Sequence, residues 1–159
     1  MHLPIPPPEE LLLVPLNVSN QYESLQIMGK HLVHLGYVKE SFVPAVIERE
    51  KRFPTGLPIV GCPVAIPHTD AEHCIKPGIA LAILKSPVSF IEMGSNGRTL
   101  PVKLIFMLSL PNPDIQVKAL QELINLFQTK GFLKNLQKAE DPNCAIQIFN
   151  KILYKYKNK

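Results

Sequence analysis

The segment VKLIFMLSL at 102–110 is apolar at nearly every position. A strand in the middle of a sheet, covered on both faces, has this pattern, whereas a half-exposed strand alternates apolar with polar residues. The segment therefore predicts a central strand. A chain of 159 residues has room for one layered domain around it, with a single core.

Other short apolar runs predict strands that pair with this one. An Asn-Gly pair at 96–97 is a turn signal typical of a β-hairpin, so part of the sheet is expected to be antiparallel. The further predicted strands are 11–14, 64–66, 79–84 and 88–93.

Apolar residues at helical spacing predict helices before and after the strands. Asn20 followed by Glu23 resembles a capping box, and Gly36 supplies a stop for the first helix. Asp114 is the expected cap of a later helix that ends at Gly131. The helices are expected over about 20–36, 41–52, 114–131 and from 141 onward.

These elements predict an α/β fold, with a mixed central β-sheet flanked by helices on both faces in a single layered domain. Residues 1–9, which include His2, are expected to form an extended lead because successive prolines exclude a helix. Residues 10–159 would then form the domain.

Charge and cysteine content exclude several classes of protein. The net charge of +4 comes largely from the tail KILYKYKNK at 151–159, and no basic-aromatic pattern indicates a nucleic-acid partner. Cys62, Cys74 and Cys144 form no CxxC pair, which argues against a disulfide framework. No run reaches the roughly 18 apolar residues of a membrane span, so we expect a cytoplasmic protein without membrane insertion.

Of the five histidines, His68 has the most informative setting. It follows a short predicted strand and Pro67, and polar residues come directly after it. Ligands of α/β proteins bind at strand ends, and a neutral imidazole, with an ordinary pKa of about 6.5, is a competent nucleophile. From these residues alone, a structural or merely exposed loop histidine is the commoner interpretation.

The segment AVIEREKRFPTGLPIVGCPVAIPHTDAEH at 45–73 resembles a phosphorylation-site signature. It is similar to that of type-2 (fructose/mannitol superfamily) IIA domains of the bacterial phosphoenolpyruvate-dependent sugar phosphotransferase system. The matching elements are Arg49-Glu50, Thr55 and the apolar-Pro-His sequence that ends at His68. The FPTGL and PHTDAEH forms are most similar to the galactitol-type branch, and the resemblance extends over roughly 10–150.

This resemblance implies a phosphocarrier, and hence a phosphotransferase, without cofactor or metal. His68 would accept a phosphoryl group on Nε2 from phospho-HPr and pass it to a cysteine of a IIB component, with the membrane IIC component involved only indirectly. A hydrogen bond from Nδ1–H to a backbone carbonyl would fix the tautomer that leaves Nε2 nucleophilic.

Arg49 and Thr55 have supporting roles in the same interpretation. The planar guanidinium of Arg49 matches phosphate oxygens, although an ordinary helix residue paired with Glu48 or Glu50 is the alternative. The Thr55 hydroxyl is as well suited to bond the backbone as the phosphate.

Gln116 marks a departure from the family pattern. Mannitol- and fructose-type members commonly have a histidine there, in the pattern His-x-x-x-Leu-x-x-Leu, and here Leu120 and Leu123 complete the pattern after Gln116. An amide cannot become cationic. We therefore expect Gln116 to face the phosphorylation site and to orient the ring or a phosphate oxygen.

Two other functions remain open at this point. Cys62, His68, Asp70, His73 and Cys74 offer ligand types suited to zinc, although their spacing matches no common zinc motif. His73 alone is either close to the site or a polar loop residue. The same type of domain also occurs in regulatory proteins, where its phosphorylation state controls partner binding without sugar transport.

Overall fold

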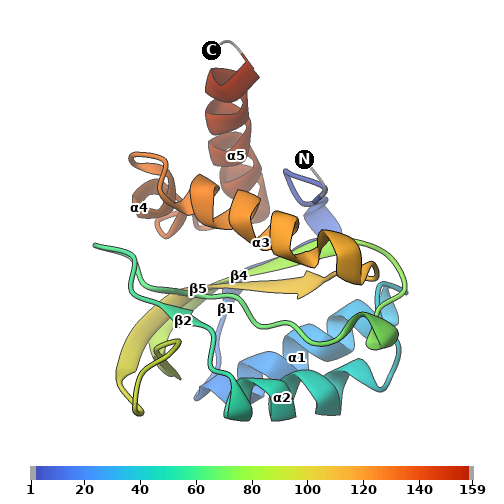
Figure 1. Ribbon diagram of the computed structural model, residues 1–159. Coiled ribbons are helices and arrows are strands. Elements are labelled where there is room, and N and C mark those ends of the chain that lie inside the picture. Colours follow the sequence, from blue (N-terminus) through green and yellow to red (C-terminus); the bar gives the residue numbers. More distant parts are fainter. Residues whose placement is uncertain (1–2, 158–159) are drawn as a thin grey trace.

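The computed structural model describes residues 3–157, so His2 and the last two residues of the basic tail lie outside the described range. A five-stranded mixed sheet runs through the molecule in the order β1-β4-β5-β3-β2 (Figure 1). The strands are β1 (Leu12–Leu16), β2 (Gly56–Leu57), β3 (Val64–Ala65), β4 (Gly78–Ile91) and β5 (Thr99–Ser109).

The predicted central strand is β5, which lies between β4 and β3. It pairs antiparallel with β4 across a hairpin that contains Asn96-Gly97, and parallel with β3. The outer strand β1 is parallel to β4, and β2 is antiparallel to β3. The prediction of a mixed sheet with an antiparallel hairpin is confirmed.

The prediction of separate strands at 79–84 and 88–93 is wrong. Both segments belong to the single strand β4, and the register of its pairing with β5 shifts between Ile83 and Val88. Pro87 lies in this irregular stretch and has no N–H for the ladder. The strand therefore bends at a bulge and continues, where the sequence suggested a break.

Within the described range, five α-helices and two short 3-10 turns complete the fold. The first helix begins as its capping pattern predicts: Asn20 Oδ1 accepts the Glu23 N–H at 3.0 Å, and the Glu23 carboxylate accepts the Ser19 N–H at 2.9 Å. The helices are α1 (Gln21–His34), α2 (Phe42–Arg52), α3 (Pro113–Phe127), α4 (Phe132–Leu136) and α5 (Pro142–Lys157), and the 3-10 turns are η1 (Glu9–Leu11) and η2 (Ala71–His73).

The predicted ends of α3 need correction. Asn112 caps this helix, since its Oδ1 accepts the N–H of Asp114 at 2.9 Å. Pro113 occupies the first helical position, where its missing N–H costs nothing. At the other end α3 finishes at Phe127, and Gly131, with φ of 80°, is the N-cap of the unpredicted helix α4.

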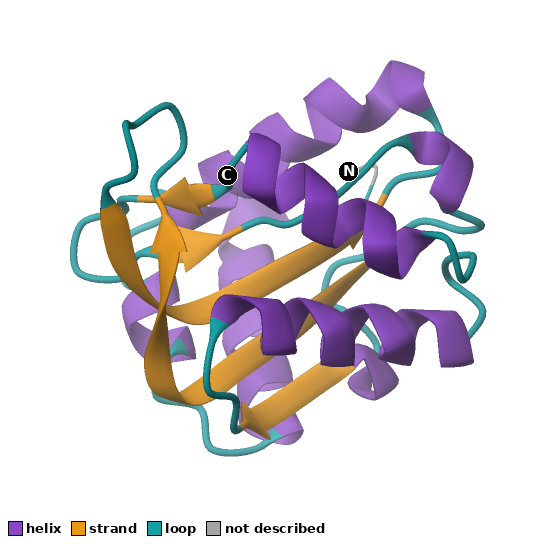
Figure 2. Cartoon of the chain, turned by 90° about the horizontal axis from the view of Figure 1, so that it is seen from below, coloured by secondary structure: helices purple, strands orange, loops and turns teal. Residues whose placement is uncertain are grey.

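The helices cover both faces of the sheet (Figure 1). Figure 2 shows the lower face, where α1 and α2 lie side by side in front of the strands. On this face Ile105 and Met107 of β5 pack with residues of α1 and α2, and on the other face Phe106 packs with residues of α3, α4 and α5. Successive β5 residues thus enter two core clusters, one on each face of the sheet, where the chain length suggested a single core. This arrangement explains the continuous apolar run and confirms the α/β prediction.

Leu3, within the predicted lead, is buried in the core on the α3 side of the sheet. The chain therefore packs against the domain from its first described residue. No helix within 3–157 is long and apolar enough to cross a membrane.

Candidate functional site

The segment after β3 places His68 beside the central strand. Pro67 continues the pairing with β5, since its carbonyl accepts the Leu108 N–H at 3.0 Å. Proline fixes its own φ and requires no hydrogen-bond acceptor for a backbone N–H. His68 is consequently held half-buried at the end of a paired segment.

The His68 imidazole is oriented by a main-chain contact. Its Nδ1 lies 2.7 Å from the carbonyl oxygen of Ile66. Because a carbonyl can only accept, Nδ1 carries the hydrogen and Nε2 keeps its lone pair. Burial is the main cause that lowers the pKa of His68; the Arg49 charge lowers it further, while the Ile66 contact and Asp70 oppose the shift.

A buried carboxylate and hydroxyl lie directly behind this contact. Glu50 and Thr55 are each 3% exposed. One Glu50 oxygen accepts the Thr55 N–H at 2.9 Å, and the other lies 2.8 Å from Thr55 Oγ1. The same Oγ1 accepts the Ile66 N–H at 3.2 Å. Burial raises the pKa of Glu50, and the two hydrogen bonds from Thr55 only partly offset it.

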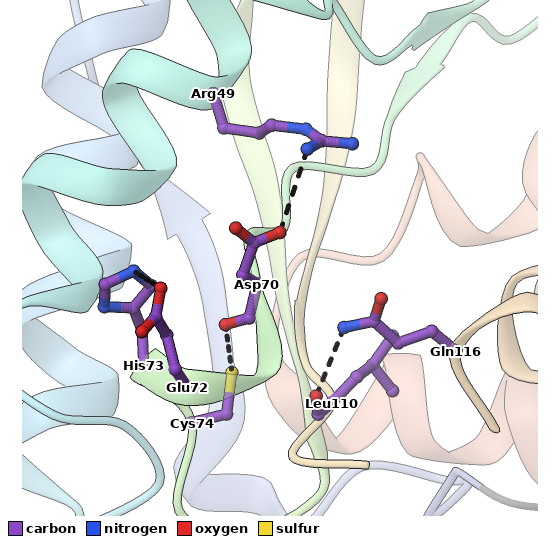
Figure 3. A network of polar contacts seen from close by, with 7 residues as sticks. All are labelled: Arg49, Asp70, Glu72, His73, Cys74, Leu110 and Gln116. Carbon is purple, nitrogen blue, oxygen red and sulfur yellow. Dashed lines mark hydrogen bonds and ion pairs between the residues drawn. The ribbon is translucent and has the colours of Figure 1, made fainter. Parts of the chain in front are cut away.

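Arg49 projects from α2 toward the segment that follows His68 (Figure 3). Its Nη1 lies 3.8 Å from Asp70 Oδ1, and its guanidinium stacks over the Phe53 ring at 4.6 Å from the ring centre. The Arg49 side chain remains 40% exposed. A half-exposed arginine side chain whose guanidinium stacks on an aromatic ring with one face keeps N–H groups available for an anion.

A single pocket brings three of the four predicted site residues together, namely His68, Arg49 and Thr55. Arg52, which forms an ion pair with Glu48 at 3.3 Å, adds a second guanidinium. A nucleophilic imidazole beside two guanidinium groups suits a dianionic phosphoryl group. The pocket is lined by Arg49, Arg52, Phe53, Pro54, Thr55, Ile66, His68, Met93, Gly94, Ser95, Leu120 and Ile124.

Gln116, the fourth predicted site residue, does not line this pocket. Its half-buried side chain turns toward the end of β5, where Nε2 donates to the Leu110 carbonyl at 3.3 Å (Figure 3). Leu110 follows the strand that holds Pro67. Gln116 therefore contacts the framework beside His68.

The structure does not bring the residues of the zinc alternative together. Cys62 is buried in the core on the α3 side of the sheet, whereas Cys74 is buried on the α1 side. His73 turns toward the start of α2, with Nδ1 2.9 Å from Ser41 Oγ and Nε2 3.6 Å from Glu72 (Figure 3 shows the latter contact). Among residues 3–157, no group of three or more His, Cys, Asp or Glu side chains is arranged to hold a metal ion.

Several site residues had no role in the sequence interpretation. Glu50 was only an element of the signature, yet it occupies the buried face of α2 that Phe42 and Val46 also form. Phe42, Val46 and Glu50 are four residues apart, and this helical spacing is the sequence signal that could have indicated the burial of Glu50. Phe53 and Met93, 59% and 47% exposed, are apolar side chains that line the same pocket, but no spacing linked them to His68.

Comparison with known proteins identifies the family of the chain. The sequence pattern of the family described as "Phosphoenolpyruvate-dependent sugar phosphotransferase system, EIIA 2" matches residues 8–152. The chain belongs to this family. Its members act as phosphocarriers of the sugar phosphotransferase system.

Relatives of the chain differ in their described roles. The galactitol-specific EIIA component of Escherichia coli (strain K12) is 30% identical over 121 residues, which cover 76% of this chain and 80% of that protein. The transcriptional regulator ManR of Bacillus subtilis (strain 168) is 28% identical over 130 residues, 80% of this chain but only 18% of the regulator.

A solved structure has the same fold. It is the complex of the mannitol enzyme IIA with phosphorylated enzyme IIB from Escherichia coli, with a TM-score of 0.72 and 21% identity, covering 91% of this chain and 96% of that chain. At this identity the likeness establishes the fold of the IIA domain.

Proposed function

We propose that His68 is the phosphoryl carrier, accepting the group from phospho-HPr and passing it to a cysteine of a IIB component. The observation that carries this proposal is the Nδ1 contact with the Ile66 carbonyl, which leaves Nε2 as the free nucleophile of the pocket. The lowered pKa of His68 adds to it, because Nε2 then stays unprotonated at neutral pH.

In the proposed first step, the Nε2 lone pair forms a bond to phosphorus while the bond from phosphorus to the donor imidazole breaks. The electron pair of that bond returns to the donor ring. In the second step a thiolate of the acceptor attacks the same phosphorus, and the electron pair of the broken P–N bond returns to Nε2. Neither step needs water, a metal or a redox partner.

Arg49 is the proposed ligand of the phosphoryl oxygens. Charge on these oxygens is spread over three atoms in the transition state, and a positioned guanidinium stabilises it. Arg49 already borders the pocket and exposes part of its guanidinium. Thr55 is proposed as a supporting residue that acts behind the ring, since its hydroxyl is already bonded to Glu50 and to Ile66.

The proposed partners are proteins, and the exchange is expected in the cytoplasm. The exposed Phe53 and Met93 at the pocket edge suit a small, transient interface. The solved complex of a IIA domain with phosphorylated IIB supports IIB as acceptor. The galactitol-specific relative favours a galactitol-like transport system, in which the IIC component takes part without touching this domain.

A regulatory role is the second candidate, because the regulator ManR contains a similar segment. Both roles use the same chemistry at His68. They differ in the acceptor: a transport domain passes its phosphoryl group to IIB, and a regulatory domain changes its affinity for another protein when phosphorylated.

The deciding experiment reconstitutes transfer from phosphoenolpyruvate with enzyme I and HPr. We expect an acid-labile, base-stable phosphate on the wild-type chain and none on His68→Ala. His73→Ala is the matched histidine control and should be labelled like wild type. Labelling that persists in His68→Ala overturns the assignment, and transfer onward to a purified IIB domain distinguishes transport from regulation.

A further inference from the structure

Glu50 is buried where a carboxylate is costly. Within residues 3–157, the hydrogen bonds to its two oxygens come from Thr55 alone, through the backbone N–H and the hydroxyl. A neutral side chain could accept one of these bonds with less desolvation. The raised pKa of Glu50 agrees with such a cost. Stability alone therefore does not account for a carboxylate here.

The two bonds from Thr55 fix the direction of its hydroxyl. Because the O–H donates to Glu50, a lone pair of Oγ1 is left to accept the Ile66 N–H at 3.2 Å. The Thr55 carbonyl also accepts this N–H, at 3.4 Å. The main chain at Ile66 is thereby anchored on the side that faces α2.

The carbonyl of the same residue, Ile66, holds His68. Its oxygen accepts from Nδ1 at 2.7 Å, and the next residue is a proline of restricted φ. Fixing the Ile66 N–H therefore limits where the Ile66 carbonyl points. A carbonyl turned away would leave Nδ1 without its acceptor, and the ring could then place its hydrogen on Nε2, the atom needed as nucleophile.

We propose that Glu50 is a positioning residue that acts on His68 through the Thr55 hydroxyl and the Ile66 main chain, so that the imidazole stays in its Nδ1–H tautomer. The proposal rests on the phosphocarrier function proposed above. When Nε2 gains the phosphoryl group the ring becomes cationic while Nδ1 keeps its hydrogen, and the Ile66 carbonyl stabilises that cation. No proton has to move at His68 in either direction of transfer.

The test uses Glu50→Gln in the full chain. Glutamine keeps the shape but can replace the Glu50 oxygen that lies 2.8 Å from Thr55 Oγ1 with an NH₂ group, which donates to Oγ1 and turns the Thr55 O–H out of its present direction. Long-range ¹H–¹⁵N spectra of the unphosphorylated protein should then show a second His68 tautomer. The rate of labelling by phospho-HPr should fall about 10- to 100-fold, by analogy with the loss of residues that orient metal-binding histidines. The thermal midpoint should change by less than about 4 °C.

Two substitutions of Thr55 provide an independent check. Thr55→Ser retains the hydroxyl and should show the wild-type tautomer with at least about a third of the wild-type rate. Thr55→Val keeps the shape without the hydroxyl and should behave like Glu50→Gln. Glu40→Gln, the same change at an exposed position just before α2, is the charge control and should equal wild type.

An unchanged His68 tautomer and rate in Glu50→Gln overturn the proposal, even if the variant is less stable. If Glu50→Gln does not fold, equal rates for Thr55→Ser and Thr55→Val overturn it. The tautomer is read without any phosphoryl donor. Failure of wild-type labelling would therefore count against the phosphocarrier function, whereas a normal tautomer in Glu50→Gln would count against the role of Glu50.

Discussion

Arg49 Nη1 lies 3.8 Å from the carboxylate of Asp70, two residues after His68. The ion pair joins α2 to the loop that follows the proposed phosphoryl carrier. Both side chains are substantially exposed, so the pair itself adds little to stability. The pair matters for phosphorylation, because a phosphoryl group on His68 and the Asp70 carboxylate would compete for hydrogen bonds from the same Arg49 guanidinium.

We expect Asp70→Asn to favour the phosphorylated form. The amide removes a negative charge beside the incoming phosphoryl group and releases Arg49. Exposed pairs are worth about 0–1 kcal/mol, so the equilibrium with phospho-HPr should shift by no more than about fivefold. Quantifying labelled protein at several HPr ratios measures the shift. A shift toward the unphosphorylated form would mean that Asp70 supports the phosphohistidine.

Arg49→Lys should slow phosphoryl transfer about 10- to 100-fold. Lysine keeps the charge but loses the planar fork and the stacking on Phe53. Rapid-quench kinetics with phospho-HPr give the rate. Arg98→Lys, the same change at an arginine paired with Glu92 at 3.4 Å, is the control and should transfer at the wild-type rate. Equal rates for the two variants would remove Arg49 from the mechanism.

The acid limb of the phosphorylation rate should lie below pH 6.5. Burial lowers the pKa of His68, so Nε2 becomes protonated only under more acidic conditions. The unfolded chain binds this proton more readily, and the free energy of unfolding should fall as the pH drops through about 6.5. An NMR titration of the His68 ring measures the pKa directly, and a midpoint above 6.5 would contradict the burial argument.

Gln116→Ala should slow transfer by about two- to fivefold. The hydrogen bond from its side-chain amide to the Leu110 carbonyl stabilises the end of β5. That strand in turn holds Pro67 through the Leu108 N–H. Labelling kinetics, with thermal unfolding as a check on folding, give the result. A wild-type rate in this variant would remove the positioning role that we infer for Gln116.

Gly56→Ala should reduce the free energy of unfolding by about 1–3 kcal/mol. A Cβ at this position would lie 2.6 Å from the backbone oxygen of Ile91, and neither strand segment can yield without loss of pairing. Denaturant unfolding measures the loss. Gly29→Ala is the comparison, because its Cβ would come closest to a Val43 methyl, at 3.2 Å, and lie at ordinary contact distance from the Val43 backbone, while the helix gains propensity. Similar losses at both positions would argue against the close backbone approach.

Local signals predicted those parts of the fold that depend on a few neighbouring residues. The Asn20–Glu23 cap and the apolar run of β5 both appear as expected. The cap of α3 was misplaced because Asn112 and Asp114 are both capping residues, although the intervening proline favours Asn112. The two-residue strand β2 is defined by its pairing with β3 and a bridge from Gly56 to Glu92, which no local pattern encodes.

The candidate site also has features that the sequence predicts and features that only tertiary packing determines. His68 and Arg49 belong to a spaced signature, and the pocket does bring them together. The direction of Gln116 and the burial of Glu50 depend on how α2, α3 and the sheet pack, which residue spacing along one segment does not determine.

Because the His68 ring is held by a carbonyl of the main chain, the contact is independent of which side chain residue 66 carries. Ile66 itself is 2% exposed and fills the core on the α3 side. A replacement such as valine would alter packing and leave the acceptor in place. Position 66 can thus be occupied by different apolar residues in related chains while the same hydrogen bond persists. A sequence comparison would therefore classify it as a core position and overlook its contact with the imidazole.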